Sequence, residues 1–221
     1  MNVRAEPQLR PGLDRKRILE AALTLVDEHG LEALSMRRLG AALGVEAMAL
    51  YYHVPSKAAL LDGLTELVLD QLEMPPPARL GDGDWADFIR VAARSFRDLG
   101  RAHPNLFALL LTVGFTNAAT IRPAEAVLAM LCDAGLDLST AFVAFVTLKS
   151  YVAGHTAWVI GDANIGHREG QISDALPEFD AHQYPRLARF AQELSQEHLD
   201  TEFERGLDLI IDGIRLRFTK H

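Results

Sequence analysis

The sequence predicts an all-α protein, with a small N-terminal three-helix helix-turn-helix domain and a larger helical domain after it. Apolar residues recur at helical spacing through most of the 221 residues, and glycine or proline interrupts the pattern at intervals of one helix length. No alternating strand pattern is present, and no hairpin dipeptide lies between two such patterns. We place the first domain at residues 1–60 and the second at residues 61–221, a chain long enough for a sizeable core.

The first helix is expected from Asp14 to His29, with Gly30 ending it. Residues 31–61 follow as two short helices around a turn and the start of a third helix. Gly44 lies where the first short helix must reverse, a position that favours a residue able to take positive φ.

The second short helix, about residues 46–53, would bury Leu50 and present Ala47, Met48, Tyr51 and Tyr52 outward. A compact helix-turn-helix with an exposed second helix is the geometry that enters a DNA major groove. Ser56 is expected to cap the next helix. Lys57 in that helix's first turn is poorly placed for the helix dipole, so we expect it to meet a DNA phosphate.

Further helices are predicted at Ser56 to about Glu73, Trp85 to Arg101, Pro104 to Leu111, Pro123 to Leu131, Leu138 to Ile160, Tyr184 to Ser195 and Leu199 to Phe218. Residues 161–184 contain glycine, proline and many polar groups, and we interpret them as a long loop, which is uncommon unless functional.

Residues 35–61 resemble the DNA-binding domain of the tetracycline-repressor family. The residues that carry the resemblance are Ser35-Met36-Arg37, Leu43-Gly44-Val45, Leu50-Tyr51, His53-Val54, Lys57 and Leu60-Leu61. The resemblance covers about residues 14–65 and is weaker beyond them. It implies a ligand-responsive transcriptional regulator, by default a repressor. Such a protein would bind double-stranded operator DNA as a homodimer and be released by a small-molecule effector in the C-terminal domain.

The DNA-contacting residues are expected to be Arg37, Ala47, Met48, Tyr51, Tyr52, His53 and Lys57. Arg37 could bond a guanine edge or a phosphate, or be an exposed helix charge. Ala47 and Met48 suit thymine methyl contacts and offer no hydrogen bond. Tyr51, His53 and Lys57 resemble the family's phosphate contacts, although Tyr51 could instead belong partly to the core. Glu46 is interpreted as a helix cap in preference to a reader of cytosine.

The net charge of −8 is unevenly distributed. Residues 1–60 contain eight Lys/Arg and seven Asp/Glu, and the remaining chain therefore carries −9. Phosphate attraction is local, so an acidic distal domain is compatible with DNA binding. The absence of a signal-like N-terminus and the single Cys132, interpreted as a small buried hydrophobe, favour a cytoplasmic location.

Residues 138–161 form an apolar stretch with one charge, Lys149, near its middle. A central charge is costly in a bilayer, and we prefer burial against a partner subunit to a membrane span. The terminal helix carries an apolar stripe that includes Ile211 and Ile214. The two helices could form an intermolecular four-helix bundle, and the resemblance implies the same homodimer.

The effector pocket is expected among the central helices, because apolar walls with a few polar groups are typical of ligand sites. Tyr151, His155 and Trp158 share one helix face, and His103 to Phe107 is our candidate trigger segment. The alternative is that these residues form core. The predicted ligand residues are Phe88, His103, Asn105, Phe107, Leu111, Tyr151, His155 and Trp158, with Phe115, Met130 and Thr147 as further candidates.

No cofactor and no metal site are predicted. The tetracycline repressor binds its drug with magnesium, but no matching ligands can be placed in this sequence. No G-x-S-x-G, P-loop, G-x-G-x-x-G or H-E-x-x-H motif is present, so we do not expect an enzyme. A ligand-binding protein without DNA binding is the remaining alternative, and the intact second short helix argues against it.

Overall fold

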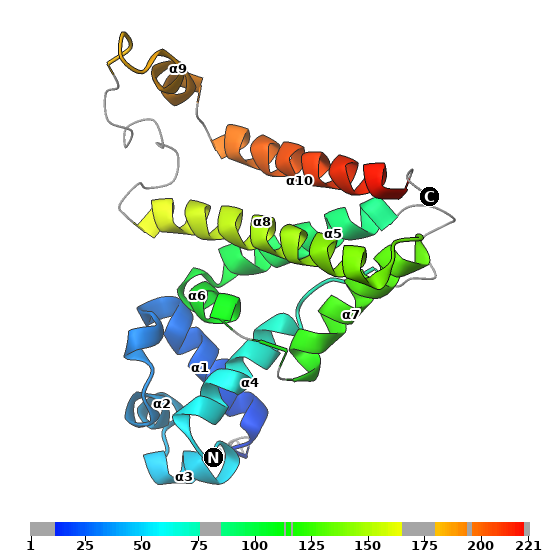
Figure 1. The fold of residues 1–221 in the computed structure, drawn as a ribbon. Coiled ribbons are helices and arrows are strands. Elements are labelled where there is room, and N and C mark those ends of the chain that lie inside the picture. Colours follow the sequence, from blue (N-terminus) through cyan, green and yellow to red (C-terminus); the bar gives the residue numbers. More distant parts are fainter. Residues whose placement is uncertain are drawn as a thin grey trace, which may run out of the picture. The chain divides into compact units, whose positions relative to one another are not determined.

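The computed structural model describes residues 12–75, 85–112, 114–115, 117–164, 180–193 and 196–218. These residues form α-helices and one 3₁₀ turn, without a strand, which confirms the predicted all-α class. The chain divides into two compact units, residues 1–67 and 68–221. The predicted boundary at residue 60 lies within helix α4, Lys57–Leu69. Figure 1 shows the order of the helices along the chain.

Unit 1 contains α1 (Arg15–His29), a 3₁₀ turn (Leu31–Ala33), α2 (Met36–Leu43), α3 (Ala47–His53) and most of α4. Gly44 ends α2 in the left-handed conformation at φ 69° and ψ 34°, as its position predicted. The Ser56 hydroxyl accepts a 3.0 Å hydrogen bond from the Ala59 amide, which confirms Ser56 as the cap of α4. The fully buried apolar side chains of this unit include Ile18, Leu39, Leu50, Leu60 and Leu64.

Unit 2 contains α5 (Trp85–Ala102), α6 (Pro104–Thr112), α7 (Ala118–Asp133), α8 (Leu138–Asn164), α9 (Pro185–Glu193) and α10 (Gln196–Phe218). One apolar core joins α5, α7, α8 and α10. Its most deeply buried members include Phe88, Leu131, Ala141, Phe203 and Leu207. In Figure 1, α8 and α10 run beside each other as the two longest helices.

A row of arginines on α5 faces acidic residues on α10. Arg94 forms a two-point ion pair with Glu204, with nitrogen–oxygen distances of 2.8 and 2.7 Å. Arg90 pairs with Asp208 at 2.8 Å. The guanidinium of Arg97 lies 4.4 Å from the centre of the Phe203 ring. These contacts fix the register of the two helices, since two-point arginine–carboxylate pairs are geometrically specific.

Several predicted helix boundaries are wrong. Helix α7 begins at Ala118, with Pro123 inside it, because Asn117 and Thr120 form a reciprocal capping box six and three residues before the proline. Helix α4 ends at Leu69, before the predicted Glu73. Helix α8 continues to Asn164, so residues 161–164 are not loop. Most of the remaining predicted loop, residues 165–179, lies outside the described residues.

Within the described residues, no helix combines the length and the apolarity that a membrane crossing requires.

Candidate functional site

Helix α3 presents its side chains away from the core of unit 1. Leu50 is completely buried and anchors the helix. Met48 and Tyr52 are 76% and 89% exposed, and Tyr51 is 41% exposed. Ala47, the first residue of α3, is half-buried. An apolar and aromatic surface on a short helix, held by one buried leucine, is available to contact another molecule.

Glu46 occupies the N-cap position of α3, but its carboxylate makes no capping hydrogen bond. The predicted cap position of Glu46 is confirmed, but the predicted capping hydrogen bond of its carboxylate is not present. Glu46 takes φ −66° and ψ 141°, and its side chain is exposed. The end of α3 that would approach base edges thus carries a solvent-facing carboxylate.

The remaining predicted DNA contacts lie on the same unit. Arg37 is exposed in the first turn of α2, and Lys57 is exposed as the first residue of α4. His53 is half-buried at the end of α3, where its ring meets Tyr52 edge-on at a centroid distance of 5.0 Å. The arrangement offers two cations and one imidazole near an exposed aromatic helix. It has the composition of a surface that contacts a phosphate backbone.

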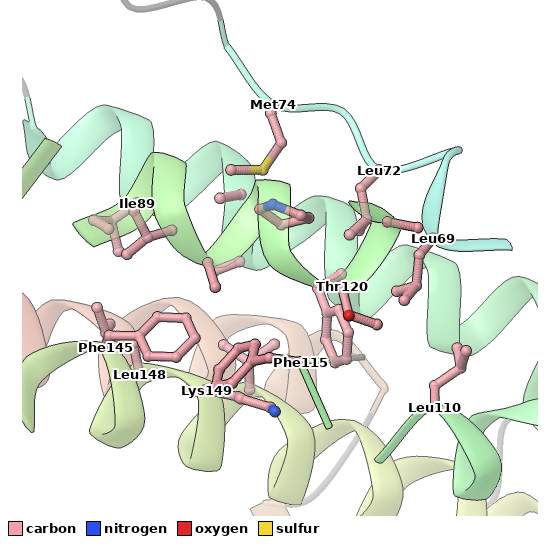
Figure 2. A pocket seen from close by; sticks show the side chains of 18 of the residues that line it. Leu69, Leu72, Met74, Ile89, Leu110, Phe115, Thr120, Phe145, Leu148 and Lys149 are labelled. Carbon is pink, nitrogen blue, oxygen red and sulfur yellow. The ribbon is translucent and has the colours of Figure 1, made fainter. Parts of the chain in front are cut away.

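Unit 2 contains an apolar cavity of about 150 Å³. Its walls come from α5, α6, α7, α8, the last residue of α4 with the segment that follows it, and Gly114 and Phe115 between α6 and α7. Figure 2 shows Ile89, Leu110, Phe145 and Leu148 around it, with Leu69, Leu72 and Met74 on another side. The described residues that line it are Leu69, Leu72, Met74, Ile89, Ala92, Ala93, Phe96, Leu110, Gly114, Phe115, Ala119, Thr120, Pro123, Ala124, Val127, Phe145, Leu148, Lys149 and Val152.

One cation borders this apolar space. The Lys149 ammonium lies 5.6 Å from the centre of the Phe115 ring, and both side chains are exposed. Figure 2 shows the two side chains beside each other at the cavity. The Thr120 hydroxyl is already engaged, because it donates to the Asn117 carbonyl at 2.9 Å.

None of the eight predicted ligand residues lines the cavity, whereas Phe115, one of the further candidates, does. Helix α8 turns Phe145, Leu148, Lys149 and Val152 toward the cavity. The predicted face with Tyr151, His155 and Trp158 meets α10 instead or is exposed. Whether those residues contact a ligand remains a prediction.

Tyr151 and His155 pack against α10. The Tyr151 hydroxyl donates to the Phe203 carbonyl at 3.0 Å, and burial raises the pKa of Tyr151. The His155 and Phe203 rings lie 5.2 Å apart. Both ring nitrogens of His155 are buried without a hydrogen-bond partner among the described residues. Burial lowers the pKa of His155, and the nearby Arg97 and Arg101 lower it further. Trp158 is half exposed.

The α5 and α6 candidates also lie off the cavity. Phe88 and Phe107 are buried in the protein interior, and the Phe107 ring packs on Phe96 at 5.7 Å. His103, Asn105 and Leu111 are half-buried. Sequence reasoning missed the neighbours that do line the cavity, above all Phe96, Leu110, Phe145 and Lys149. A stripe at positions 145, 148, 149 and 152 was visible on α8, but the sequence did not show which stripe faced the cavity.

The cavity lining does not suit a magnesium-bound ligand. Magnesium prefers carboxylate and other oxygen ligands. The lining residues that the structure describes include no Asp, Glu or His. Within the described part of the chain, no cluster of three or more His, Cys, Asp or Glu could hold a metal ion.

Family models match most of the chain. Residues 18–64 match the bacterial regulatory proteins of the tetR family, and residues 76–218 match the tetracyclin repressor-like C-terminal domain. The transcriptional repressor DrrR1 of Streptomyces coeruleorubidus is 32% identical over 94% of this chain and 79% of its own length. The class A tetracycline repressor of Escherichia coli is 32% identical over 90% of this chain and 89% of its own length.

Solved structures give the same result. A possible TetR-family regulator from Streptomyces coelicolor A3(2) aligns with a TM-score of 0.80 at 31% identity, covering 92% of this chain and 99% of that one. The S. coelicolor protein ActR, in complex with actinorhodin, aligns with a TM-score of 0.77 at 28% identity, covering 95% of this chain and all of ActR. The chain therefore belongs to the tetracycline-repressor family and is a ligand-responsive, DNA-binding transcriptional regulator.

Proposed function

We propose that this protein represses transcription by binding operator DNA through α3, and that a small molecule in the unit 2 cavity releases it. The observation that carries the DNA assignment is the exposure of Met48 and Tyr52 on a helix anchored by buried Leu50. A helix held in this way can enter a major groove without loss of its own core. Its relatives DrrR1 and the tetracycline repressors support repression as the outcome.

Base contacts are assigned to Ala47, Met48 and Tyr52, and backbone contacts to Arg37, Tyr51, His53 and Lys57. Apolar Ala47 and Met48 can discriminate thymine through its methyl group. Lys57 is exposed, and a cation in the first turn of a helix gains nothing from the helix dipole. A DNA phosphate would pair with the charge of the Lys57 ammonium.

The cavity is proposed as the effector site because its walls include the end of the helix that begins at the DNA-contacting lysine. Leu69 lines the cavity and is the last residue of α4, while Lys57 is its first. A ligand that displaces Leu69 would thus act on the helix that carries Lys57. The complex of ActR with actinorhodin supports a small-molecule effector in this family.

Dimers are typical of the family, and we propose α8 and α10 as the dimer surface. Each helix has large apolar side chains that its own protomer leaves exposed. On α8 they include Phe142 at 49% and Val143 at 63%, and on α10 they include Leu209 at 76%. Exposed apolar patches of this kind mark protein interfaces. The two α3 helices of one dimer would then read two half-sites about one turn of the DNA helix apart.

We further propose that the protein has no catalytic activity and acts in the cytoplasm, where the DNA of a bacterial cell is accessible. Both proposals follow from the regulatory function.

The function is tested by selecting duplexes bound by the full-length protein from random DNA, then measuring release of the selected duplex by a panel of small molecules. We expect a two-fold symmetric sequence to be enriched and at least one compound to release it. Tyr52→Ala should weaken the complex, whereas Tyr184→Ala, which removes an exposed tyrosine from unit 2, should not. Failure to enrich any sequence would overturn the proposal.

A further inference from the structure

We propose that the unit 2 cavity selects a small lipophilic organic anion, and that the Lys149 ammonium binds the anionic group. The inference deepens the proposed function, since it takes the cavity as the effector site. It is carried by the juxtaposition of an apolar cavity with a cation, Lys149, that forms no ion pair within the described part of the chain (Figure 2).

The cavity offers a ligand almost no polar partner besides Lys149. Of its 19 lining residues, Thr120 and Lys149 are the ones with a polar side chain. The Thr120 hydroxyl and backbone are committed to the Asn117 capping box, with the hydroxyl donating at 2.9 Å and the amide donating to the Asn117 side chain at 3.0 Å. A ligand's polar group therefore gains most by lying at Lys149.

Lys149 is available for such a group. Among the described residues, no carboxylate lies within ion-pairing distance of its ammonium, and its nearby partner is the Phe115 ring at 5.6 Å. Many other cations of unit 2 are paired, including Arg90, Arg94 and Arg101 with acids of α10. A carboxylate or phenolate would accept charge-assisted hydrogen bonds from Lys149, a stronger interaction than an exposed cation–aromatic contact.

The volume limits the apolar part of the ligand. A dry apolar cavity of about 150 Å³ holds a molecule the size of benzene, and this cavity has a volume of about 150 Å³. One aromatic ring or a short alkyl chain fits, while a multi-ring ligand would require the walls to move. Phe96, Phe115 and Phe145 provide aromatic surface for such a ring.

The charge of the lining disfavours cationic ligands. Lys149 would repel an ammonium group, and no lining carboxylate among the described residues would compensate it. The same lack of carboxylate and imidazole groups leaves a metal-chelated effector without protein ligands. The lining therefore favours a simple organic anion over both a cation and a metal complex.

The test uses three probes that differ in one terminal group: 4-phenylbutyrate, 4-phenylbutan-1-ol and 4-phenylbutylamine. Their binding to the full-length protein is measured by isothermal titration calorimetry. We expect the carboxylate to bind about five- to tenfold more tightly than the alcohol, and the amine most weakly. The preference should shrink at high ionic strength, because Lys149 is exposed.

Lys149→Gln should remove the preference for the carboxylate and leave the affinity for the alcohol unchanged, and Lys149→Glu should favour the amine. Lys16→Gln, an exposed lysine on α1, is the matched control and should behave as wild type. Ala124→Leu should weaken all three probes by filling the cavity. Ala92→Leu serves the same purpose if Ala124→Leu loses the helical circular dichroism of the wild type.

Equal binding of carboxylate and alcohol by the wild type would overturn the inference, as would an unchanged preference in Lys149→Gln or no binding of any probe at millimolar concentration. Operator binding is measured separately by fluorescence anisotropy. A wild-type protein that binds operator DNA but shows no anion preference refutes this inference alone. An anion preference without operator binding refutes the proposed repressor function and supports the ligand class.

Discussion

The Tyr151 hydroxyl lies against the backbone of α10, 3.0 Å from the Phe203 carbonyl oxygen to which it donates. Gly206 makes this approach possible. A Cβ atom at Gly206 would lie 2.2 Å from the Tyr151 hydroxyl oxygen and 2.6 Å from its ring carbon Cζ. Tyr151 thus joins α8 to α10 through a position where α10 has no side chain.

Gly206→Ala should destabilise the protein by about 1–3 kcal/mol, because overpacking of a well-filled site has that cost. In a Tyr151→Ala background the same change should be neutral or stabilising, since the clashing atoms are gone and alanine favours a helix over glycine by about 1 kcal/mol. Urea unfolding of the four proteins in this double-mutant cycle measures the coupling. Additive effects would show that Tyr151 does not limit the site.

His155 should make stability depend on pH. Burial, followed by Arg97 and Arg101, lowers its pKa, against smaller opposite effects from Glu202 and Asp200, while Tyr151, Trp158 and Phe203 surround its ring. The unfolded chain then binds the proton more readily than the folded one. The stability linked to His155 is therefore present above its ordinary pKa of 6.5 and falls as pH decreases below that value.

The measurement is the free energy of unfolding between pH 7.5 and pH 5, for the wild type and His155→Leu. We expect a smaller loss of stability in the variant, because the buried imidazole no longer has to resist protonation. Parallel curves for the two proteins would contradict the assignment.

Lys57→Ala should weaken DNA binding to all duplexes by a similar factor and reduce the slope of log affinity against log salt by about one unit. Removal of one phosphate contact has this signature because phosphates carry no sequence information. Arg186→Ala, which removes an exposed charge on α9, is the control and should leave the slope unchanged. Met48→Gln should instead change which duplex is preferred. An unaltered salt slope in Lys57→Ala would exclude Lys57 as a phosphate contact.

The fold and the exposed helix α3 could be predicted from sequence because their signals are local. Gly44 and Ser56 mark helix ends by their own backbone chemistry, and Leu50 alone decides which side of α3 is buried. The cavity could not be predicted in this way. Helix α8 is apolar on several faces, so the face with Leu148 and Val152 and the face with Tyr151 and His155 are equally plausible cavity walls from sequence. Only the packing of α10 on Tyr151 decides between them. Likewise, Asn117 starts α7 before Pro123 through a capping box that depends on two side chains.

Dimerisation should depend on exposed residues of α8 and α10. Leu209→Asp should give monomers by size-exclusion chromatography with light scattering, with unchanged helical circular dichroism, since Leu209 is 76% exposed in the protomer. Val91→Asp, at an exposed apolar site on α5, is the control and should stay dimeric. Ile211 and Ile214 are unsuitable for this test, because they are 0% and 7% exposed and belong to the protomer core. A dimeric Leu209→Asp together with a dimeric Val143→Asp would remove these helix faces from the interface.

Release by an effector requires the ligand to bind the DNA-free form more tightly, and DNA must then weaken ligand binding by the same factor. The dissociation constant of the releasing compound, measured by calorimetry with and without operator, should differ by about 5- to 150-fold.

Helix α4, from Lys57 to Leu69, is the proposed carrier of this coupling. Asp62→Gly, at an exposed position inside α4, should reduce the factor toward one, because glycine costs a helix interior about 0.5–1 kcal/mol and loosens it. Asp62→Ala removes the same charge, keeps the helix, and should retain the wild-type factor. Equal ligand constants with and without operator in the wild type would refute the allosteric mechanism, and equal factors in the glycine and alanine variants would remove α4 from it.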